Sequence, residues 1–401
     1  MSRLSSDQPP LILREAWTED VVELDGGTAA AISNLGIATV TPIADSTWRI
    51  TGIRRVGTIR LATRELRIAP KVPISSLFHL LAVSQQWGEW RHELVDLDHA
   101  TDLYSAVAEA FSTLALHALR GGVLRDYRQV QSAEPTIRGR WLVGEQIRRR
   151  QGLLLPAELQ YDEFTADITE NRLIRSAGRR LLGLGGVPIY VRGRLLEADR
   201  LLGGAELLIR GDQIPVVEFS RKNERFRAAV GLARLILAGG SFEHRVGGIA
   251  ATGFLLNLAA VFERFVEHEM RRSAARYGGS IVGQDIASLD VDGKVEIRPD
   301  IVWKLGGRVL AVVDAKYKAE RPSGFPNADV YQMLAYCIRH EVRTGHLVYA
   351  AGNEEPARYK IAQSGTTIVC HALDLDRSPS EISAQIDHIV EVALLSSAAA
   401  A

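Results

Sequence analysis

The chain of 401 residues is short of cysteine and has no net charge. Its two cysteines, Cys337 and Cys370, are too few for a disulfide framework, and we expect them to be free thiols in a reducing cytoplasm. Its 48 basic residues balance 48 acidic ones, so no global positive field attracts nucleic acid. Any contact with DNA must therefore be local or be supplied by a partner.

Membrane and targeting segments are not evident either. The first ten residues, MSRLSSDQPP, lack the apolar stretch of a signal peptide. A long uncharged run, 246–262, contains glycines, Thr252 and Asn257, which predicts a loop leading into a buried helix and not a membrane span. We therefore expect a cytoplasmic protein that does not enter a membrane.

Several catalytic motifs are absent from the sequence. It contains no G-x-x-x-x-G-K-[ST] loop, which argues against nucleotide hydrolysis of the Walker type. It also lacks H-E-x-x-H and paired cysteines, the usual signals of a zinc site, and has no G-x-S-x-G nucleophile motif. Zinc chemistry and serine hydrolase chemistry are therefore not expected.

The composition is that of an ordinary globular protein, with 46% apolar and 24% charged residues. The length predicts two or three domains, and the fold class that we predict is α/β in a multidomain α+β arrangement. We expect a β-rich domain over 1–75, a mainly helical middle region with short strands over 76–245, and an α/β domain over 246–401. The glycine pairs at 239–240 and 247–248 mark the second boundary, and the middle region is the part that we expect to bind a partner.

The spacing of apolar residues predicts the following elements. Strands are expected at 47–53, 57–62, 65–68, 127–141, 159–164, 280–289, 295–304, 308–317, 345–351 and 366–373, and helical spacing covers 74–90, 100–120, 167–184, 195–240, 254–272, 328–343 and 379–395. The last domain therefore runs helix, three strands, helix, two strands, helix.

A predicted hairpin at 295–317 carries the most informative charges. Gly306-Gly307 separates its two strands, which contain Asp300, Asp314 and Lys316. A loop of two glycines would place Asp300 opposite Val313, with the two aspartates on opposite faces. A three-residue loop would place Asp300 opposite Asp314, and strand alternation would return Lys316 to the same face. We favour the second register.

Two carboxylates and an ammonium group on one patch suit a hard divalent cation such as Mg²⁺, with the lysine orienting water or neutralising phosphoryl charge. The alternative is a surface hairpin with a cross-strand ion pair. The apolar flanks, Ile301 to Trp303 and Leu310 to Val313, argue against it because they predict a sheet that is covered on both faces.

Further candidate residues lie on the neighbouring helices and in a basic segment. Glu263 is at the edge of the apolar face of 254–272, where it could serve the site or simply pair with an arginine. Gln332 and Tyr336 are four residues apart and so share a helix face. The basic segment could contact phosphate or a partner, or could be a solvated helix end; it contains Arg138, Arg140, Arg148, Arg149 and Arg150.

This set of residues resembles the PD-(D/E)xK nuclease superfamily, with Pro299-Asp300 on one strand and Asp314-Ala315-Lys316 on the next. The whole chain resembles more specifically the McrC family, the nuclease subunits of McrBC modification-dependent restriction systems. The segments that carry this likeness are IRGRW (137–141), YDEFTADITENRLIRSA (161–177), VFERFVEHEMRR (261–272), RPDIVW (298–303), VVDAKYK (312–318) and YQMLAY (331–336).

The resemblance implies roles for these residues. Asp300, Asp314 and the carbonyl of Ala315 would hold Mg²⁺, Lys316 would be catalytic, Glu263 would be an auxiliary catalytic and metal-binding carboxylate, and Gln332 and Tyr336 would support them. It also implies an endonuclease that cuts modified double-stranded DNA, of the 5-methylcytosine type, and that stimulates an AAA+ GTPase partner. The alternative is a non-catalytic regulator of such a motor with a nuclease-like scaffold. The family assigns no catalytic role to the arginines.

Overall fold

The computed structural model describes residues 10–15, 19–61, 64–84, 87, 102–151, 153–183, 187–209, 211–239, 252–317, 327–350 and 356–398. The chain forms two compact units. The first combines Met1–Trp90, Ala100–Leu103 and Phe242–Ala401, and the second contains Arg91–His99 and Tyr104–Ser241. The N-terminal and C-terminal parts of the chain, which the sequence analysis assigned to different domains, belong to the same unit. The division into three domains stays a prediction. Its second boundary lies outside the described residues.

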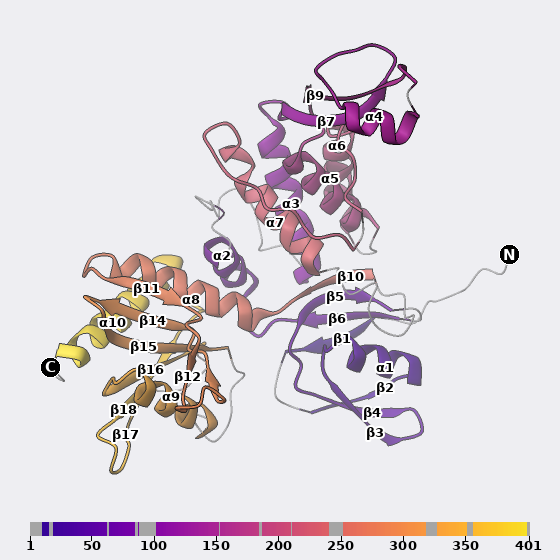
Figure 1. The fold of residues 1–401 in the computed structure, drawn as a ribbon. Coiled ribbons are helices and arrows are strands. Elements are labelled where there is room, and N and C mark those ends of the chain that lie inside the picture. Colours follow the sequence, from indigo (N-terminus) through magenta and orange to yellow (C-terminus); the bar gives the residue numbers. More distant parts are fainter. Residues whose placement is uncertain are drawn as a thin grey trace. The chain divides into compact units, whose positions relative to one another are not determined.

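The N-terminal part of the first unit contains two small sheets and two helices (Figure 1). One sheet has the order β1-β6-β5-β10, and the other has the order β2-β4-β3. The bounds of these elements are β1 (Leu11–Arg14), β2 (Asp20–Glu23), α1 (Gly26–Asn34), β3 (Thr39–Ala44), β4 (Thr47–Thr51), β5 (Val56–Arg60), β6 (Glu65–Ala69), α2 (Ile74–Ser84) and β10 (Thr252–Leu256). The sequence patterns predicted strands β4 to β6 but missed helix α1.

Strand β10 corrects the prediction that residues 254–272 form one helix. It pairs antiparallel with β5, and Leu255 lies opposite Gly57. A side chain at Gly57 would place its Cβ 2.2 Å from the carbonyl oxygen of Phe254, and its φ of +131° also favours glycine. Glycine therefore permits the close pairing that holds the first residues of this stretch in a strand, and helix α8 (Leu258–Ala274) begins after the cap at Asn257.

The C-terminal part of the first unit is a six-stranded mixed sheet of order β11-β14-β15-β16-β18-β17. Its elements are β11 (Ser280–Gly283), β14 (Ile301–Leu305), β15 (Arg308–Lys316), α9 (Asn327–Arg339), β16 (Thr344–Ala350), β17 (Ala357–Lys360), β18 (Thr367–Leu373) and α10 (Pro379–Ala398), with the short pair β12 (Ala287–Ser288) and β13 (Glu296–Ile297) beside it. Helices α8 and α10 pack on one another and on the sheet. Strand β17 was not predicted.

Helix α9 packs against the central strands of the sheet and forms a hydrophobic core with them. Met333 and Cys337 pack with Leu347 and Cys370 in a fully buried cluster. Gly345 on β16 allows this approach, since a Cβ there would lie 2.5 Å from Met333 Sδ. Both cysteines are free and buried, which confirms the prediction of free thiols.

The central hairpin has the predicted register, but its loop differs from the predicted one. Leu305 pairs with Arg308, so the loop has two residues and the predicted three-residue loop is wrong. A bulge then follows: Lys304 pairs with Val309, but Trp303 pairs with Ala311, which leaves Leu310 as the extra residue. From there Ile301 lies opposite Val313, and one further step places Asp300, just before β14, across from Asp314.

The second unit consists of helices and a three-stranded sheet of order β7-β9-β8. Its elements are α3 (Leu103–Leu119), β7 (Asp126–Glu134), β8 (Arg140–Trp141), α4 (Val143–Arg150), β9 (Ala157–Thr165), α5 (Thr169–Leu182), α6 (Ile189–Leu201), η2 (Glu224–Phe226) and α7 (Arg227–Gly239). The helical expectation for 195–240 is wrong between Leu202 and Asn223. There Asn223 accepts from the backbone N–H of Ser220 at 2.7 Å and donates to the carbonyl of Glu218 at 2.9 Å, local bonds that compete with a helix.

Among the described residues, no helix is both long and apolar enough to cross a membrane.

Candidate functional site

The hairpin register brings two acidic side chains together at one end of the C-terminal sheet. Asp314 is on β15 and is 2% exposed. Asp300 is held against the same strand, because the backbone N–H of Ala315 donates to its Oδ2 at 2.9 Å. Both residues were predicted from the sequence as metal-binding, and the structure places them next to each other.

Lys316 connects these acids to helix α9. Its Nζ forms an ion pair with Asp314 Oδ2 and donates to Gln332 Oε1 at 2.9 Å. Gln332 Nε2 in turn donates to the hydroxyl of Tyr336 at 2.6 Å, and that hydroxyl donates to the carbonyl of Arg298 at 3.2 Å. A continuous chain of hydrogen bonds thus fixes the ammonium group between β15 and α9.

The electrostatics of the site show an excess of negative charge. Burial, followed by the nearby Asp314 carboxylate, raises the pKa of Asp300 to about 7. Burial and Asp314 also raise the pKa of Glu263 on α8. Burial is the largest influence on the pKa of Lys316 and lowers it, but the carboxylates of Asp314, Asp329 and Asp300 together make the net shift upward. One lysine therefore faces several carboxylates in a desolvated setting.

Two polar residues at this site were not singled out from the sequence. Asp329 on α9 is 3% exposed, accepts from the hydroxyl of Tyr349 at 2.9 Å, and contributes to the raised pKa of Lys316. Its position three residues before Gln332, on the same helix face, is a signal that could have identified it. Gln284 donates from Nε2 to Asp300 Oδ1 at 2.9 Å, and it has no spacing signal because it follows a strand end.

The donor set fits a hard divalent cation. Carboxylate oxygens and a main-chain carbonyl are the protein ligands of Mg²⁺, which keeps several waters and is usually bound by one or two carboxylates together with substrate phosphates. No group of three or more His, Cys, Asp or Glu side chains that could hold a metal ion occurs in the described part of the chain. The residues that could hold such a cation are Asp300 and Asp314 with the Ala315 carbonyl, and Glu263 on α8 does not form a three-carboxylate group with them in this structure.

The basic residues lie in the second unit, where acidic partners already engage most of them. Arg138 stacks on Tyr161 at 3.8 Å from the ring centre and pairs with Glu134 at 3.3 Å. The remaining ion pairs are Arg148 and Arg149 with Glu145 (2.6 and 3.0 Å), and Arg149 and Arg150 with Glu158 (3.7 and 3.1 Å). These arginines are mainly parts of local ion-pair networks on exposed surface.

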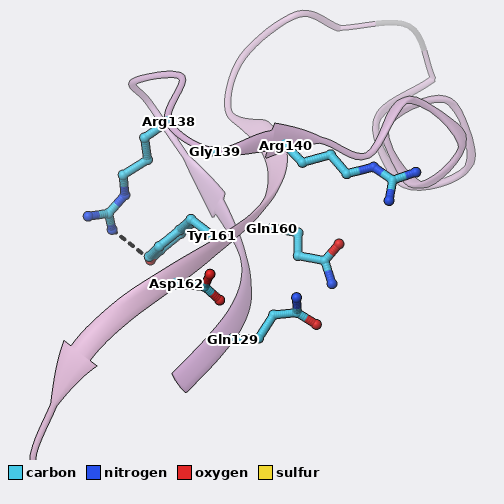
Figure 2. A pocket seen from close by; sticks show the side chains of 7 residues that line it. All are labelled: Gln129, Arg138, Gly139, Arg140, Gln160, Tyr161 and Asp162. Atoms are coloured by element: carbon cyan, nitrogen blue, oxygen red, sulfur yellow. Dashed lines mark hydrogen bonds between the residues drawn. The ribbon is translucent and has the colours of Figure 1, made fainter. Parts of the chain in front are cut away.

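A polar pocket of about 560 Å³ lies beside this segment. Figure 2 shows Arg138 and Arg140 extending in different directions from the turn at Gly139. Glycine is required at that turn, because its φ is +69° and a Cβ would lie 2.4 Å from the carbonyl oxygen of Gln160. Hydrogen-bonding side chains of β7 and β9 complete the lining: Gln129, Gln160, Tyr161 and Asp162.

The fold and the site together define an α/β protein whose mixed sheet presents buried carboxylates beside a lysine at one end. A sequence model of the family described as McrBC 5-methylcytosine restriction system component matches residues 51–350. The chain belongs to this family.

Two solved structures are similar to this chain. One similar chain comes from a refined half-complex of a tetradecameric assembly of Thermococcus gammatolerans McrB AAA+ hexamers with bound McrC; it is 18% identical with a TM-score of 0.63, over 96% of this chain and 99% of that one. This likeness shows a shared fold. Another, from the cryo-EM structure of the Thermococcus gammatolerans McrBC complex, is 22% identical with a TM-score of 0.43, over 67% and 89% of the two chains. No curated protein matches significantly.

Proposed function

We propose that this chain is the Mg²⁺-dependent DNA endonuclease subunit of a modification-dependent restriction system. The observation that carries the proposal is the convergence of Asp300, Asp314 and Lys316 at one end of the sheet, with burial raising the pKa of Asp300 to about 7. Buried carboxylates that outnumber their cations suit a site that binds a positive ion. This arrangement is the acid-acid-lysine set of a PD-(D/E)xK nuclease core.

Each residue has a defined task in this proposal. Asp300, Asp314 and the Ala315 carbonyl would hold Mg²⁺, and Glu263 would complete the site from α8. A bound Mg²⁺ supplies Lewis-acid polarisation of the phosphodiester and lowers the pKa of a bound water. Lys316 donates hydrogen bonds toward the attacking water or the developing phosphoryl charge, and its link to Gln332 keeps the ammonium group in place.

The partner follows from the family and from the neighbouring structure. In that structure McrB forms AAA+ hexamers with bound McrC. This chain contains no Walker loop of its own. We therefore propose that it acts with an AAA+ GTPase of the McrB type, that it stimulates this motor, and that cutting takes place on modified double-stranded DNA in the cytoplasm.

The exposed arginines Arg138, Arg140 and Arg148 to Arg150 are proposed to contact the partner or DNA from the second unit. The ion pairs of Arg138 with Glu134 and of Arg148 with Glu145 can be exchanged for pairs with phosphate or with acidic side chains at little cost, because exposed pairs contribute little to stability.

Cleavage of a methylated plasmid by the complex reconstituted with its motor tests the proposal. Asp314→Ala and Lys316→Ala should abolish cutting while the motor still hydrolyses GTP. Asp292→Ala and Lys294→Ala are matched controls, since they break an ion pair of the same type (3.0 Å) whose side chains are 69% and 77% exposed. Undiminished cutting by Asp314→Ala would refute the assignment.

A second candidate is a non-catalytic regulator of the motor. It is favoured by the finding that the described residues contain no preformed group of three metal-ligating side chains. Truncation after residue 245 is a poor test, because β10 would be removed from the N-terminal sheet. The regulator would be favoured over the nuclease if, in the wild-type complex, this chain stimulates GTP hydrolysis by the motor but DNA is not cut at any Mg²⁺ concentration.

A further inference from the structure

Gln284 holds the carboxylate of Asp300 from the side opposite to strand β15. Its side-chain Nε2 donates to Asp300 Oδ1 at 2.9 Å, and its backbone N–H donates to the Asp300 carbonyl at 2.9 Å. The backbone N–H of Ala315 donates to the other carboxylate oxygen, Oδ2, at 2.9 Å. Each oxygen of this carboxylate therefore has one fixed donor.

The two donors determine how the carboxylate can be used. An ionised carboxylate offers about four lone-pair positions, two on each oxygen. One position on each oxygen is occupied by Gln284 or Ala315, so one position on each remains for another ligand. Because one donor directly follows β11 and the other lies on β15, rotation about the Cβ–Cγ bond would break both hydrogen bonds at once.

The backbone of Gln284 is unusual in a way that points to its side chain. Its φ is +53°, in the left-handed region where a residue with a Cβ is strained. Glycine would adopt this conformation with less strain. In the described part of the chain, Gln151, Glu341 and Gln363 are further non-glycine residues with such a φ, and Gln284 is the one whose side chain donates a hydrogen bond to Asp300.

We propose that Gln284 is a positioning residue that orients the Asp300 carboxylate for the divalent cation. The inference rests on the proposed function, because it assigns Gln284 a role at the same site. Without the Gln284 side-chain amide, Asp300 Oδ1 loses its hydrogen-bond donor, and the Asp300 carboxylate can rotate away from Asp314. Residues that orient metal ligands in this way typically change metal affinity or activity by about 10- to 100-fold when they are removed.

Two substitutions separate positioning from folding. Gln284→Leu keeps most of the side-chain volume but removes the donor. Gln284→Gly removes the donor and also relieves the left-handed backbone, so its melting temperature should stay the same or rise. Gln363→Gly is the matched control, since it replaces the same residue type at a φ of +60° in an exposed turn.

The first measurement is calorimetric titration of the purified chain with Mn²⁺ or Mg²⁺, which needs no cleavage. Both Gln284 variants should bind the cation about 10- to 100-fold more weakly than wild type. In the reconstituted complex, the Mg²⁺ concentration for half-maximal cutting should rise by a similar factor. Excess Mg²⁺ should restore cutting by the Gln284 variants, whereas it should not restore cutting by Asp300→Ala.

The outcomes distinguish this inference from the proposed function. If Gln284→Gly binds the cation and cuts like wild type while Asp300→Ala does not cut, the positioning role is wrong and the nuclease assignment stands. If Asp300→Ala also cuts normally, the nuclease assignment itself fails. Weaker binding by Gln284→Gly with a melting temperature at or above that of wild type, and no change in Gln363→Gly, supports the positioning role.

Discussion

Two charged regions of this molecule are built in opposite ways. At the end of the C-terminal sheet, Asp300, Asp314 and Glu263 share one lysine, and burial raises the pKa of Asp300 and Glu263. On the β7–β9 sheet and helix α4, Glu134, Glu145 and Glu158 each pair with at least one arginine. There the pKa of Glu134 is lowered by hydrogen bonds from Ser132 and Tyr161, and that of Glu145 by a hydrogen bond from Arg148.

The two regions differ in whether their charges are compensated within the protein. The exposed pairs are satisfied within the protein, so they need no ligand. The buried acids are not, and their mutual repulsion persists until a proton or a cation neutralises it. Such stored repulsion opposes folding and favours cation binding, which is why the acidic region and not the basic one is our candidate for catalysis.

The largest effect is expected from Asp300→Asn. Cutting should fall by about 1000-fold, since a neutral amide replaces a carboxylate that we propose as a ligand of the cation. The melting temperature without metal should rise at pH 8, because the substitution removes a buried negative charge beside Asp314. Loss of activity together with loss of stability would contradict the comparison, and the same assays on Asp292→Asn, at an exposed site, provide the control.

The pH dependence of stability should also show this repulsion. In the fold the pKa of Asp300 is about 7, whereas in the unfolded chain it is about 4. Between these values the folded state binds more protons than the unfolded state, so stability falls as the pH rises from about 4 to about 7. The loss is on the order of 4 kcal/mol for this group. It should be smaller in Asp300→Asn and should be reversed by Mg²⁺ at pH 8; identical pH profiles for the two proteins would refute it.

A smaller effect is expected from a buried amide next to the basic segment. Gln146 is 3% exposed. Its Oε1 accepts from Trp141 Nε1 at 3.2 Å and from the Glu158 N–H at 2.6 Å, and its Nε2 donates to the Leu153 and Pro156 carbonyls at 2.5 and 3.2 Å. Gln146→Ala should lower the free energy of unfolding of the second unit by about 2–3 kcal/mol.

Hydrogen exchange of strands β8 and β9 measures this effect locally. Gln131→Ala on β7 is the matched control, because Gln131 is exposed and should leave exchange unchanged. Equal exchange in the two variants would show that Gln146 is not what organises the basic segment.

The smallest effect is expected from the exposed ion pairs. Arg148 is 67% exposed and pairs with Glu145 at 2.6 Å. Arg148→Ala should change the free energy of unfolding by less than about 0.5 kcal/mol. Thermal unfolding at low and high salt would measure it, and a loss above about 1 kcal/mol would mean that the basic surface is structural after all.

The sequence predicted the register of the hairpin strands correctly and their loop wrongly. Asp300, Asp314 and Lys316 could be placed on one face because strand periodicity is a local property. The length of the loop could not be predicted, because a three-residue loop and a two-residue loop followed by a bulge at Leu310 produce the same register. Only the packed sheet distinguishes these two solutions.

Features that depend on distant segments could not be predicted. Strand β10 forms because Gly57 lets the chain at Phe254 approach closely, and nearly 200 residues of sequence separate the two strands, roughly the size of a whole domain. Gln284 contacts Asp300 through a left-handed turn that no periodic pattern marks. In contrast, Gln332 and Tyr336 were identified because their spacing of four residues is itself the signal.

The most direct test of the central claim is to locate the cation. Fe²⁺ can replace Mg²⁺ and, with ascorbate and peroxide, cleaves the polypeptide next to the bound ion. We predict cuts near Asp300 and near Asp314, suppressed by excess Mg²⁺ and absent from the double variant Asp300→Asn/Asp314→Asn. Cuts confined to other parts of the chain, or cuts near these residues that persist in the double variant, would contradict the account.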